Sequence, residues 1–186
     1  DGMTITNSAS GVYSIAIKDI DNDGDLDIAS ASKNDDTIAW YKNNGAANPS
    51  WVKEAVSTNS DGANNIKIID IDNDGDQDIL ASSENDDTIA WFKNDGSTNP
   101  NWTKINVSTI ADGARSVDAA DIDNDGDLDI LSTSTNDGKV TWYRNDGTNN
   151  PSWIAKNISN IDTPDSSGFR DVSLADIDKD GDLDIA

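Results

Sequence analysis

Four acidic nine-residue segments have residue types and a spacing that suit a divalent cation. Each segment reads Asp-x-Asp-x-Asp-Gly-Asp-x-Asp, and the copies cover residues 19–27, 70–78, 121–129 and 176–184, called loops 1 to 4 below. Carboxylates this close together repel one another by about 1 kcal/mol per pair in water and by more in a less polar setting. A cation among them would replace that repulsion with attraction, so the pattern indicates a metal site.

The order of residues within each loop predicts which atoms would coordinate the cation. Side chains at loop positions 1, 3, 5 and 9 can turn toward one centre, glycine at position 6 permits the sharp turn, and position 7 can offer its backbone carbonyl. An all-oxygen shell on a flexible loop suits Ca²⁺ better than Mg²⁺. We therefore predict one Ca²⁺ per loop, up to four. The candidate metal residues are Asp19, Asp21, Asp23, Asp25, Asp27, Asp70, Asp72, Asp74, Asp76, Asp78, Asp121, Asp123, Asp125, Asp127, Asp129, Asp176, Asp178, Asp180, Asp182 and Asp184.

The loops share only the first half of the EF-hand pattern. An EF-hand loop carries a bidentate Glu at position 12, where this chain has Ser30, Ala81 and Ser132 in the first three copies. The flanking segments also lack a helical pattern. We therefore expect the aspartate at position 9 to supply the closing carboxylate.

Composition narrows the class of protein. With 34% apolar residues and a net charge of −23, the 186-residue chain approaches the disordered class, but twenty of its 36 acidic residues lie in the loops and its six tryptophans recur at fixed places. Four Ca²⁺ ions would bring the charge from −23 to −15, which still disfavours nucleic acid and anionic membranes as partners. The absence of cysteine and histidine excludes disulfides, Cys/His zinc sites and Ser-His-Asp triads.

The loops recur with a period typical of repeat proteins. Asp19, Asp70 and Asp121 are 51 residues apart, and Asp176 follows after 55, with the extra residues near 162–165. We divide the chain, as one region 1–186, into repeats of approximately 11–61, 62–112 and 113–167, a partial repeat 168–186, and residues 1–10 as the last strand of a preceding repeat. The sequence reads as a piece of something longer, and it has no apolar run long enough to cross a bilayer.

Each period contains four short strand-like runs separated by turn residues. The run before each loop, Val12 to Lys18 in the first copy and Asn65 to Ile69 in the second, alternates apolar and polar residues, as in Ile15 and Ile17, which indicates a strand. Four such strands joined by hairpins predict an all-β chain, a β-propeller of four-stranded antiparallel blades with three whole and two partial blades. A closed ring typically has four to eight blades. Either further blades from the same longer chain or a second copy would close it.

Outside the loops, the tryptophans and the glutamates are the remaining candidates for chemistry. Tryptophans in the third run suit blade packing, whereas Trp51, Trp102 and Trp153 follow polar Asn-Pro turns and could either pack or form a ligand-binding rim, since aromatic faces bind sugars. The only glutamates, Glu54 and Glu84, occupy unrelated repeat positions, which does not suit the paired acids of a glycosidase. We predict that this stretch is not an enzyme.

These motifs resemble the FG-GAP and VCBS repeat family, which includes the integrin alpha-subunit propeller. The resemblance rests on the acidic loop between strands one and two and on the Trp-Tyr-x-Asn-x-Gly segment at 40–45 and 142–147, where Phe92 replaces Tyr in the middle copy. It implies a seven- or eight-bladed propeller with calcium in outward-facing hairpin loops and a location outside the cell or at its surface. It assigns the side chains at positions 1, 3, 5 and 9 and the carbonyl at position 7 as ligands.

The expected function is therefore a calcium-stabilised extracellular or cell-surface module for binding or adhesion, with a glycan or a protein as ligand. Two alternatives remain open. The segment could be a non-catalytic accessory region of a secreted polysaccharide-active enzyme, or a structural component of a surface layer or filament.

Overall fold

The computed structural model describes residues 3–148, 150–160 and 169–186. In that part of the chain the regular secondary structure consists of β-strands, with no helix. Three four-stranded antiparallel sheets, called blades 1 to 3, follow one another and precede a two-stranded sheet. Blade 1 comprises β1 (Val12–Lys18), β2 (Asp27–Ser32), β3 (Thr37–Asn43) and β4 (Trp51–Ser57). Blade 2 comprises β5 (Ala63–Ile69), β6 (Asp78–Ser83), β7 (Thr88–Lys93) and β8 (Thr103–Ser108). Blade 3 comprises β9 (Ala114–Ala120), β10 (Asp129–Ser134), β11 (Lys139–Arg144) and β12 (Ile154–Asn160), and the half-blade comprises β13 (Leu174–Ala175) and β14 (Asp184–Ile185).

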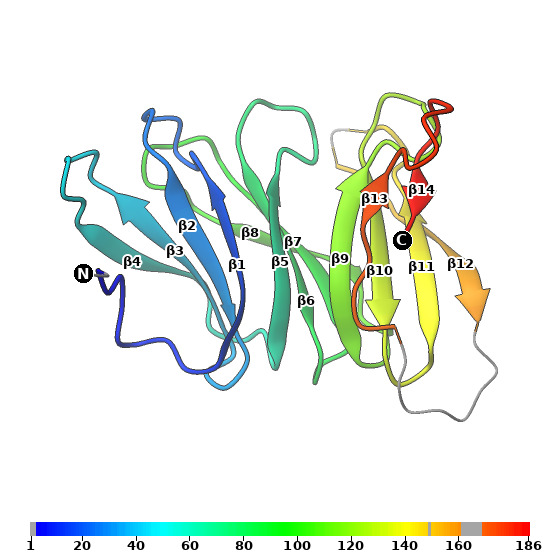
Figure 1. Ribbon diagram of the computed structural model, residues 1–186, viewed down its shortest axis with the longest axis horizontal. Helices are drawn as coiled ribbons and strands as arrows, with labels where there is room; N and C mark the ends of the chain where they lie inside the picture. The colour runs from blue at the N-terminus through cyan, green and yellow to red at the C-terminus, as the bar shows by residue number, and fades with distance from the viewer. Residues whose placement is uncertain (1–2, 149, 161–168) are drawn as a thin grey trace.

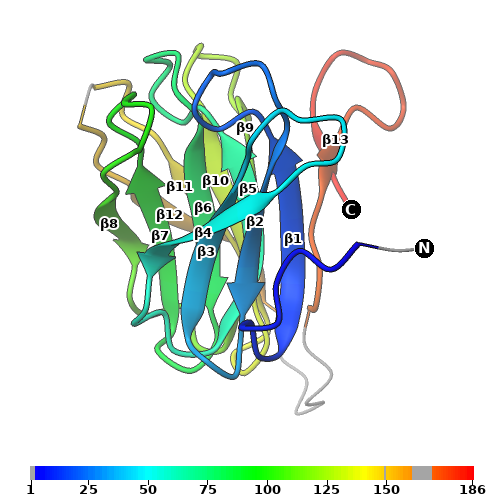
Figure 2. The same cartoon turned by 90° about the vertical axis from the view of Figure 1, so that its left-hand side faces the viewer.

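The blades stand side by side along the long axis of the molecule, with β5 between β1 and β9 (Figure 1). In the view turned by 90°, the blades overlap and β1 and β13 lie along one edge (Figure 2). Within every blade the strand order equals the chain order, because each strand pairs with the next through a hairpin. This arrangement confirms the predicted propeller-type architecture, and it places all four acidic loops at the upper end of the blades in Figure 1.

The core lies between successive blades rather than within one. Between blades 1 and 2, small residues of the second strand, Ala29 and Ala31, leave room for the rings of Trp40 and Phe92, all at most 1% exposed. The corresponding positions of blades 2 and 3 form a second cluster around Trp91. Alternating apolar residues thus stabilise the fold only when a neighbouring blade covers them.

The two ends of the stack show what one missing neighbour changes. Ile15 of β1 is 60% exposed, whereas its counterparts Ile66 and Val117 are 2% and 0% exposed beneath the preceding blade. On the opposite face, Ile20 is 0% exposed and its counterpart Ile177 is 60% exposed. Residues 3–10 contain no strand, so their assignment to a preceding blade stays a prediction, and the extra residues near 162–165 lie outside the described part.

Candidate metal centres

Each acidic loop connects the first two strands of a blade. In loop 1, Asp19 directly follows β1 and Asp27 begins β2, and the pairing of Lys18 with Asp27 holds the two ends together. Two residues turn the backbone through the left-handed region, Asn22 with φ 56° and Gly24 with φ 95°. The other loops repeat both angles closely, so the predicted turn at position 6 is present in every copy. Asparagine tolerates the left-handed region better than most residues, which suits position 4.

The aspartate at position 1 shapes its loop through two backbone hydrogen bonds. Asp19 accepts one from the Asp23 amide at 3.1 Å and one from the Gly24 amide at 2.9 Å. Asp70 and Asp121 repeat both bonds in loops 2 and 3. A carboxylate has about four lone-pair sites, so these oxygens keep acceptor capacity for a cation.

The aspartate at position 9 is a buried anchor. Asp27, Asp78 and Asp129 are each 0% exposed. Asp78 accepts hydrogen bonds from the amides of Asn94 at 2.8 Å and Ile71 at 3.1 Å. Burial nevertheless raises the pKa of the Asp78 carboxyl to about 7, because these bonds only partly replace the lost water. Burial raises the pKa of Asp27 and Asp129 in the same direction. A carboxylate in this setting needs a nearby positive charge to stay ionised.

The aspartate at position 3 shows that the site fits a cation. The Asp21 side chain is 0% exposed, and neither of its oxygens accepts a hydrogen bond, although the Lys42 ammonium lies against Oδ2. In loop 2, Oδ1 of Asp72 is likewise buried without a hydrogen bond. Burying a carboxylate oxygen without a hydrogen bond is costly, and a single ammonium offsets only part of that cost where several carboxylates lie together. Oxygens of this kind are ready to coordinate a metal ion.

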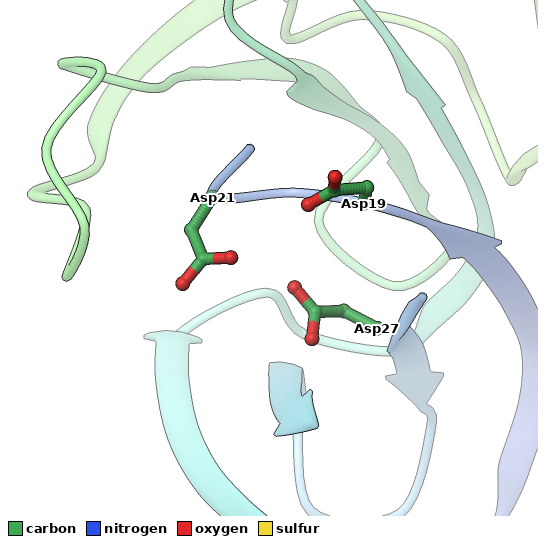
Figure 3. Close-up of side chains that lie close together, drawn as sticks. All are labelled: Asp19, Asp21 and Asp27. Atoms are coloured by element: carbon green, nitrogen blue, oxygen red, sulfur yellow. The ribbon is translucent and has the colours of Figure 1, made fainter. Parts of the chain in front are cut away.

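Three carboxylates converge in each loop. Figure 3 shows Asp19, Asp21 and Asp27 turned toward a common point, and one oxygen from each lies within 4.8 Å of the others. Loops 2 and 4 unite the same positions 1, 3 and 9, whereas loop 3 unites positions 1, 3 and 5. At position 5 of loop 1, Asp23 instead accepts a bond from the Asp25 amide at 3.0 Å. The Asp triads could therefore hold a metal ion with oxygen ligands only.

The aspartate side chain at position 7 of loops 1 to 3 is not among the converging carboxylates and lies against a glycine that follows the third strand. A Cβ on Gly45, Gly96 or Gly147 would collide with the carboxylate of Asp25, Asp76 or Asp127 respectively. Each of these glycines also has a positive φ, from 67° to 70°. The Asn-x-Gly turn after the third strand therefore closes over the loop of its own blade. In addition, Asp76 accepts a bond from Asn22 of the preceding loop at 3.2 Å, which links neighbouring loops.

An asparagine at the end of the third strand clamps the loop, and the sequence marked it only as part of the Trp-Tyr-x-Asn-x-Gly segment. The Asn43 amide donates to Asp27 at 2.8 Å, and its side chain donates to the Leu26 carbonyl at 3.0 Å. Asn94 and Asn145 repeat both contacts. Asn94 also donates to the Ile20 carbonyl of blade 1 at 3.2 Å, so it joins two blades. Its recurrence at one offset from the tryptophan was the signal that could have identified it.

A basic residue on the third strand reaches into each of loops 1 to 3, and this was also missed. Lys42 contacts Asp21 and lies 3.2 Å from Asp23. Arg144 donates from Nε to Asp123 at 2.5 Å and from Nη2 to Asp125 at 2.8 Å. The third member is Lys93, beside Asp72 and Asp74. Although burial opposes its charge, these two carboxylates raise the pKa of Lys93.

Two of the three rim tryptophans pack against the preceding blade. Trp153 meets Trp91 edge to face, with ring centroids 6.5 Å apart and an interplanar angle of 86°. Trp102 packs against the cluster that contains Trp40. All three rim tryptophans, Trp51 included, are half-buried. The structure thus supports a packing role for Trp102 and Trp153 and leaves part of each ring exposed.

One of the two glutamates ties three blades together. Glu84 of blade 2 accepts from Lys33 of blade 1 at 2.7 Å and from Arg115 of blade 3 at 2.8 Å. Burial opposes its ionisation, but the two cations outweigh burial and lower the pKa of Glu84. A carboxylate kept ionised by ion pairs is suited to holding blades in register rather than to donating a proton.

Comparisons with known proteins agree with this geometry. A family model described as FG-GAP-like repeat matches residues 19–81, 70–132 and 121–186. No curated protein matches the chain. Among solved structures, one described as a streptogramin B lyase structure is similar, with a TM-score of 0.52 and 16% sequence identity. The match covers 82% of this chain but only 42% of that one, and at this identity it concerns the fold alone. Among the described residues, no helix has the length and apolar character needed to span a membrane.

Proposed function

The chain belongs to the FG-GAP-like repeat family, and on this premise we propose that it is a calcium-stabilised propeller segment that acts outside the cell or at its surface as a binding or adhesion module. The observation that carries the proposal is the buried Asp21 carboxylate, which accepts no hydrogen bond where Asp19 and Asp27 converge on it. A dication at that point would compensate the charge of all three aspartates.

Calcium is the ion that best suits these sites. The converging ligand atoms are all carboxylate oxygens, which favour hard cations, and the loop backbone is irregular rather than part of a rigid strand. Mg²⁺ demands stricter octahedral geometry and keeps its waters. When bound, the ion supplies the positive charge that compensates the converging carboxylates. The residues at positions 1 and 9 hold the loop in shape through their backbone hydrogen bonds, and in loop 1 position 3 contributes a carboxylate that accepts no hydrogen bond.

An extracellular location follows from the role proposed for calcium. Structural sites that bind calcium weakly are loaded only where calcium is abundant, which favours the outside of the cell. The net charge of −23 makes nucleic acid and anionic membrane surfaces poor partners. We place no catalytic step in this segment, since the loop aspartates converge on the proposed metal sites and Glu84 joins blades.

Further blades complete the ring in this proposal. The exposed Ile15 occupies the position that blades bury elsewhere in the stack, so its natural cover is another blade. We assign that blade to a longer form of the same chain, with a second copy as the other source. A mass of 19.8 kDa in solution for the folded 186-residue chain would exclude the second copy.

The proposed ligand is a glycan or an extracellular protein, and the half-exposed tryptophan rim is the proposed contact surface. We expect a glycan array to give hits in calcium that disappear in EDTA. Replacing the rim residue Trp102 by alanine should lower binding at least about tenfold, the effect of losing about 1.4 kcal/mol of stacking. Trp102→Tyr keeps an aromatic face and serves as the matched control.

The array separates the possible outcomes when melting and calcium binding are measured on the same variants. Binding that survives Trp102→Ala, Trp51→Ala and Trp153→Ala would move the ligand away from the rim. No calcium-dependent hit on any glycan would exclude the glycan ligand, and capture of an extracellular protein partner would then be the remaining form of the proposal.

A further inference from the structure

A basic side chain is built into each of the three acidic loops whose third strand is present. Lys42, Lys93 and Arg144 occupy the same position, two residues after the tryptophan of β3, β7 and β11. Each reaches the aspartates at positions 3 and 5 of its own loop. The cation thus lies among the carboxylates that converge on the candidate metal site.

The strand register holds the basic side chain in place beside its loop. The third strand pairs with the second, and Tyr41 lies opposite Ile28, which brings Lys42 beside the end of loop 1. The Lys42 ammonium also lies 5.8 Å from the centre of the Trp40 ring, and Lys93 stands at the same distance from Trp91. The Lys42 and Lys93 side chains are each only 31% exposed. Arg144 repeats the ion pairs with its loop, although its side chain is 45% exposed, so the contact with the loop aspartates is a property of the repeat rather than of one surface lysine.

We propose that these residues are resident counter-cations that support the metal-free loop and set how tightly it binds calcium. The inference rests on the proposed function, because it concerns the same loops. In the metal-free loop, the single positive charge attracts carboxylates that otherwise repel one another. In the loaded loop, the same charge repels the dication. Both effects weaken calcium binding, whether the side chain stays in contact or moves away.

If these basic residues instead positioned the metal ligands, removing them would change the calcium affinity in the opposite direction. Outer residues that orient metal ligands normally strengthen binding, and removing them lowers affinity by about 10–100-fold. A counter-cation weakens binding, so its removal raises affinity. The direction of the change therefore separates the two roles.

The experiment is a calcium titration followed by NMR. Gly24, Gly75, Gly126 and Gly181 stand at position 6, one in each loop, so their amide signals report the four sites separately. In Lys42→Gln, we expect the calcium midpoint of the Gly24 signal to fall about tenfold, as expected for loss of one positive charge roughly 5 Å from a dication. The midpoints of Gly75 and Gly126 should stay unchanged.

Lys18→Gln is the matched control. Lys18 directly precedes loop 1, its side chain is exposed, and its replacement changes the net charge by the same amount. An unchanged or higher Gly24 midpoint in Lys42→Gln, or an equal fall in Lys18→Gln, would overturn the proposal while calcium binding by the wild type stands.

A second measurement needs no metal. In EDTA, Lys42→Gln should melt at a lower temperature than Lys18→Gln, and Lys42→Arg should restore most of the difference. Equal melting temperatures for the two glutamine variants would contradict the supporting role. If the wild type shows no shift of any loop glycine in calcium, both the proposed function and this inference fail together.

Discussion

Removal of calcium is expected to lower the melting temperature of the chain by on the order of 20–40 °C. A ligand that binds only the folded state, at about one hundred times its Kd, adds about 2.7 kcal/mol per site. In a chain of this size, each kcal/mol corresponds to about 2–4 °C in Tm. Four loops with converging carboxylates therefore predict a large combined effect.

The expected loss has two physical sources. Chelation removes the binding free energy, and it leaves both carboxylate oxygens of Asp21 and Oδ1 of Asp72 buried without a hydrogen bond. Lys42, Lys93 and Arg144 limit the damage, since each still supplies one positive charge to its loop. The metal-free chain should therefore remain partly folded in the cold rather than lose all structure.

The measurement is thermal unfolding by circular dichroism in calcium, in EDTA, and in EDTA followed by excess calcium. Magnesium at equal ionic strength is the control, and it should restore only a small part of the loss. Calorimetric titration of the metal-free chain should give a stoichiometry of up to four. An unchanged melting temperature after thorough removal of divalent ions would overturn the structural role of calcium.

Much of the fold could be predicted because the signals are local and repeated. Alternating apolar residues between turn residues predicted β1 with its observed bounds. The corresponding strand of blade 2 begins at Ala63, two residues earlier than the alternation suggested. A register shift between Ala63 and Asn65 breaks the alternation there, and a bulge of this kind leaves no mark in the pattern.

The loops were recognisable from their aspartates, but the residues that surround them were not. Asn43 and Lys42 meet loop 1 only because β2 and β3 pair in one particular register. That register is a property of the folded sheet, not of the loop sequence. The recurrence of a basic residue followed by asparagine after each Trp-aromatic pair was visible, yet its meaning depended on knowing which loop lies beside it.

The contacts of the rim tryptophans could not be predicted from the sequence either, because they are made between repeats rather than within one. The polar Asn-Pro turn before Trp153 left both packing and a ligand-binding rim open, because that turn gives no sign of what covers the ring. The cover is Trp91, which belongs to the preceding repeat. Contacts between repeats follow from how blades stack, so a sequence interpreted one repeat at a time cannot reveal them.

Trp91→Ala is expected to lower the free energy of unfolding by about 3–5 kcal/mol, the usual range for truncating a large buried aromatic residue. Trp91 is 0% exposed at the centre of the cluster between blades 2 and 3. The substitution removes its edge-to-face contact with Trp153 and leaves a cavity that the sheets cannot close without shifting. Urea unfolding in saturating calcium is the measurement.

Trp51→Ala is the control. Trp51 occupies the repeat position of Trp153, but the described residues include no preceding blade whose tryptophan could cover its ring. It should cost less than half as much as Trp91→Ala. Combining Trp91→Ala with Trp153→Ala should cost less than the sum of the two single changes, by about 0.5–1.5 kcal/mol for a direct aromatic pair. Equal losses at positions 51 and 91, or full additivity of the pair, would contradict the interface that the structure shows.

The shape of the Trp91→Ala transition carries a further consequence of blade stacking. Stability in a stack is approximately the sum of each blade and its contacts with the next. Blade 3 contacts blade 2 through the cluster that contains Trp91 and through the Glu84–Arg115 ion pair. Weakening the cluster leaves mainly polar contacts, namely the partly exposed Glu84–Arg115 and Lys67–Asp118 ion pairs and hydrogen bonds such as that from the Val117 amide to Asn65, and these contribute less than the buried apolar residues. Blade 3 and the half-blade should then unfold before blades 1 and 2, and the single transition of the wild type should separate into two.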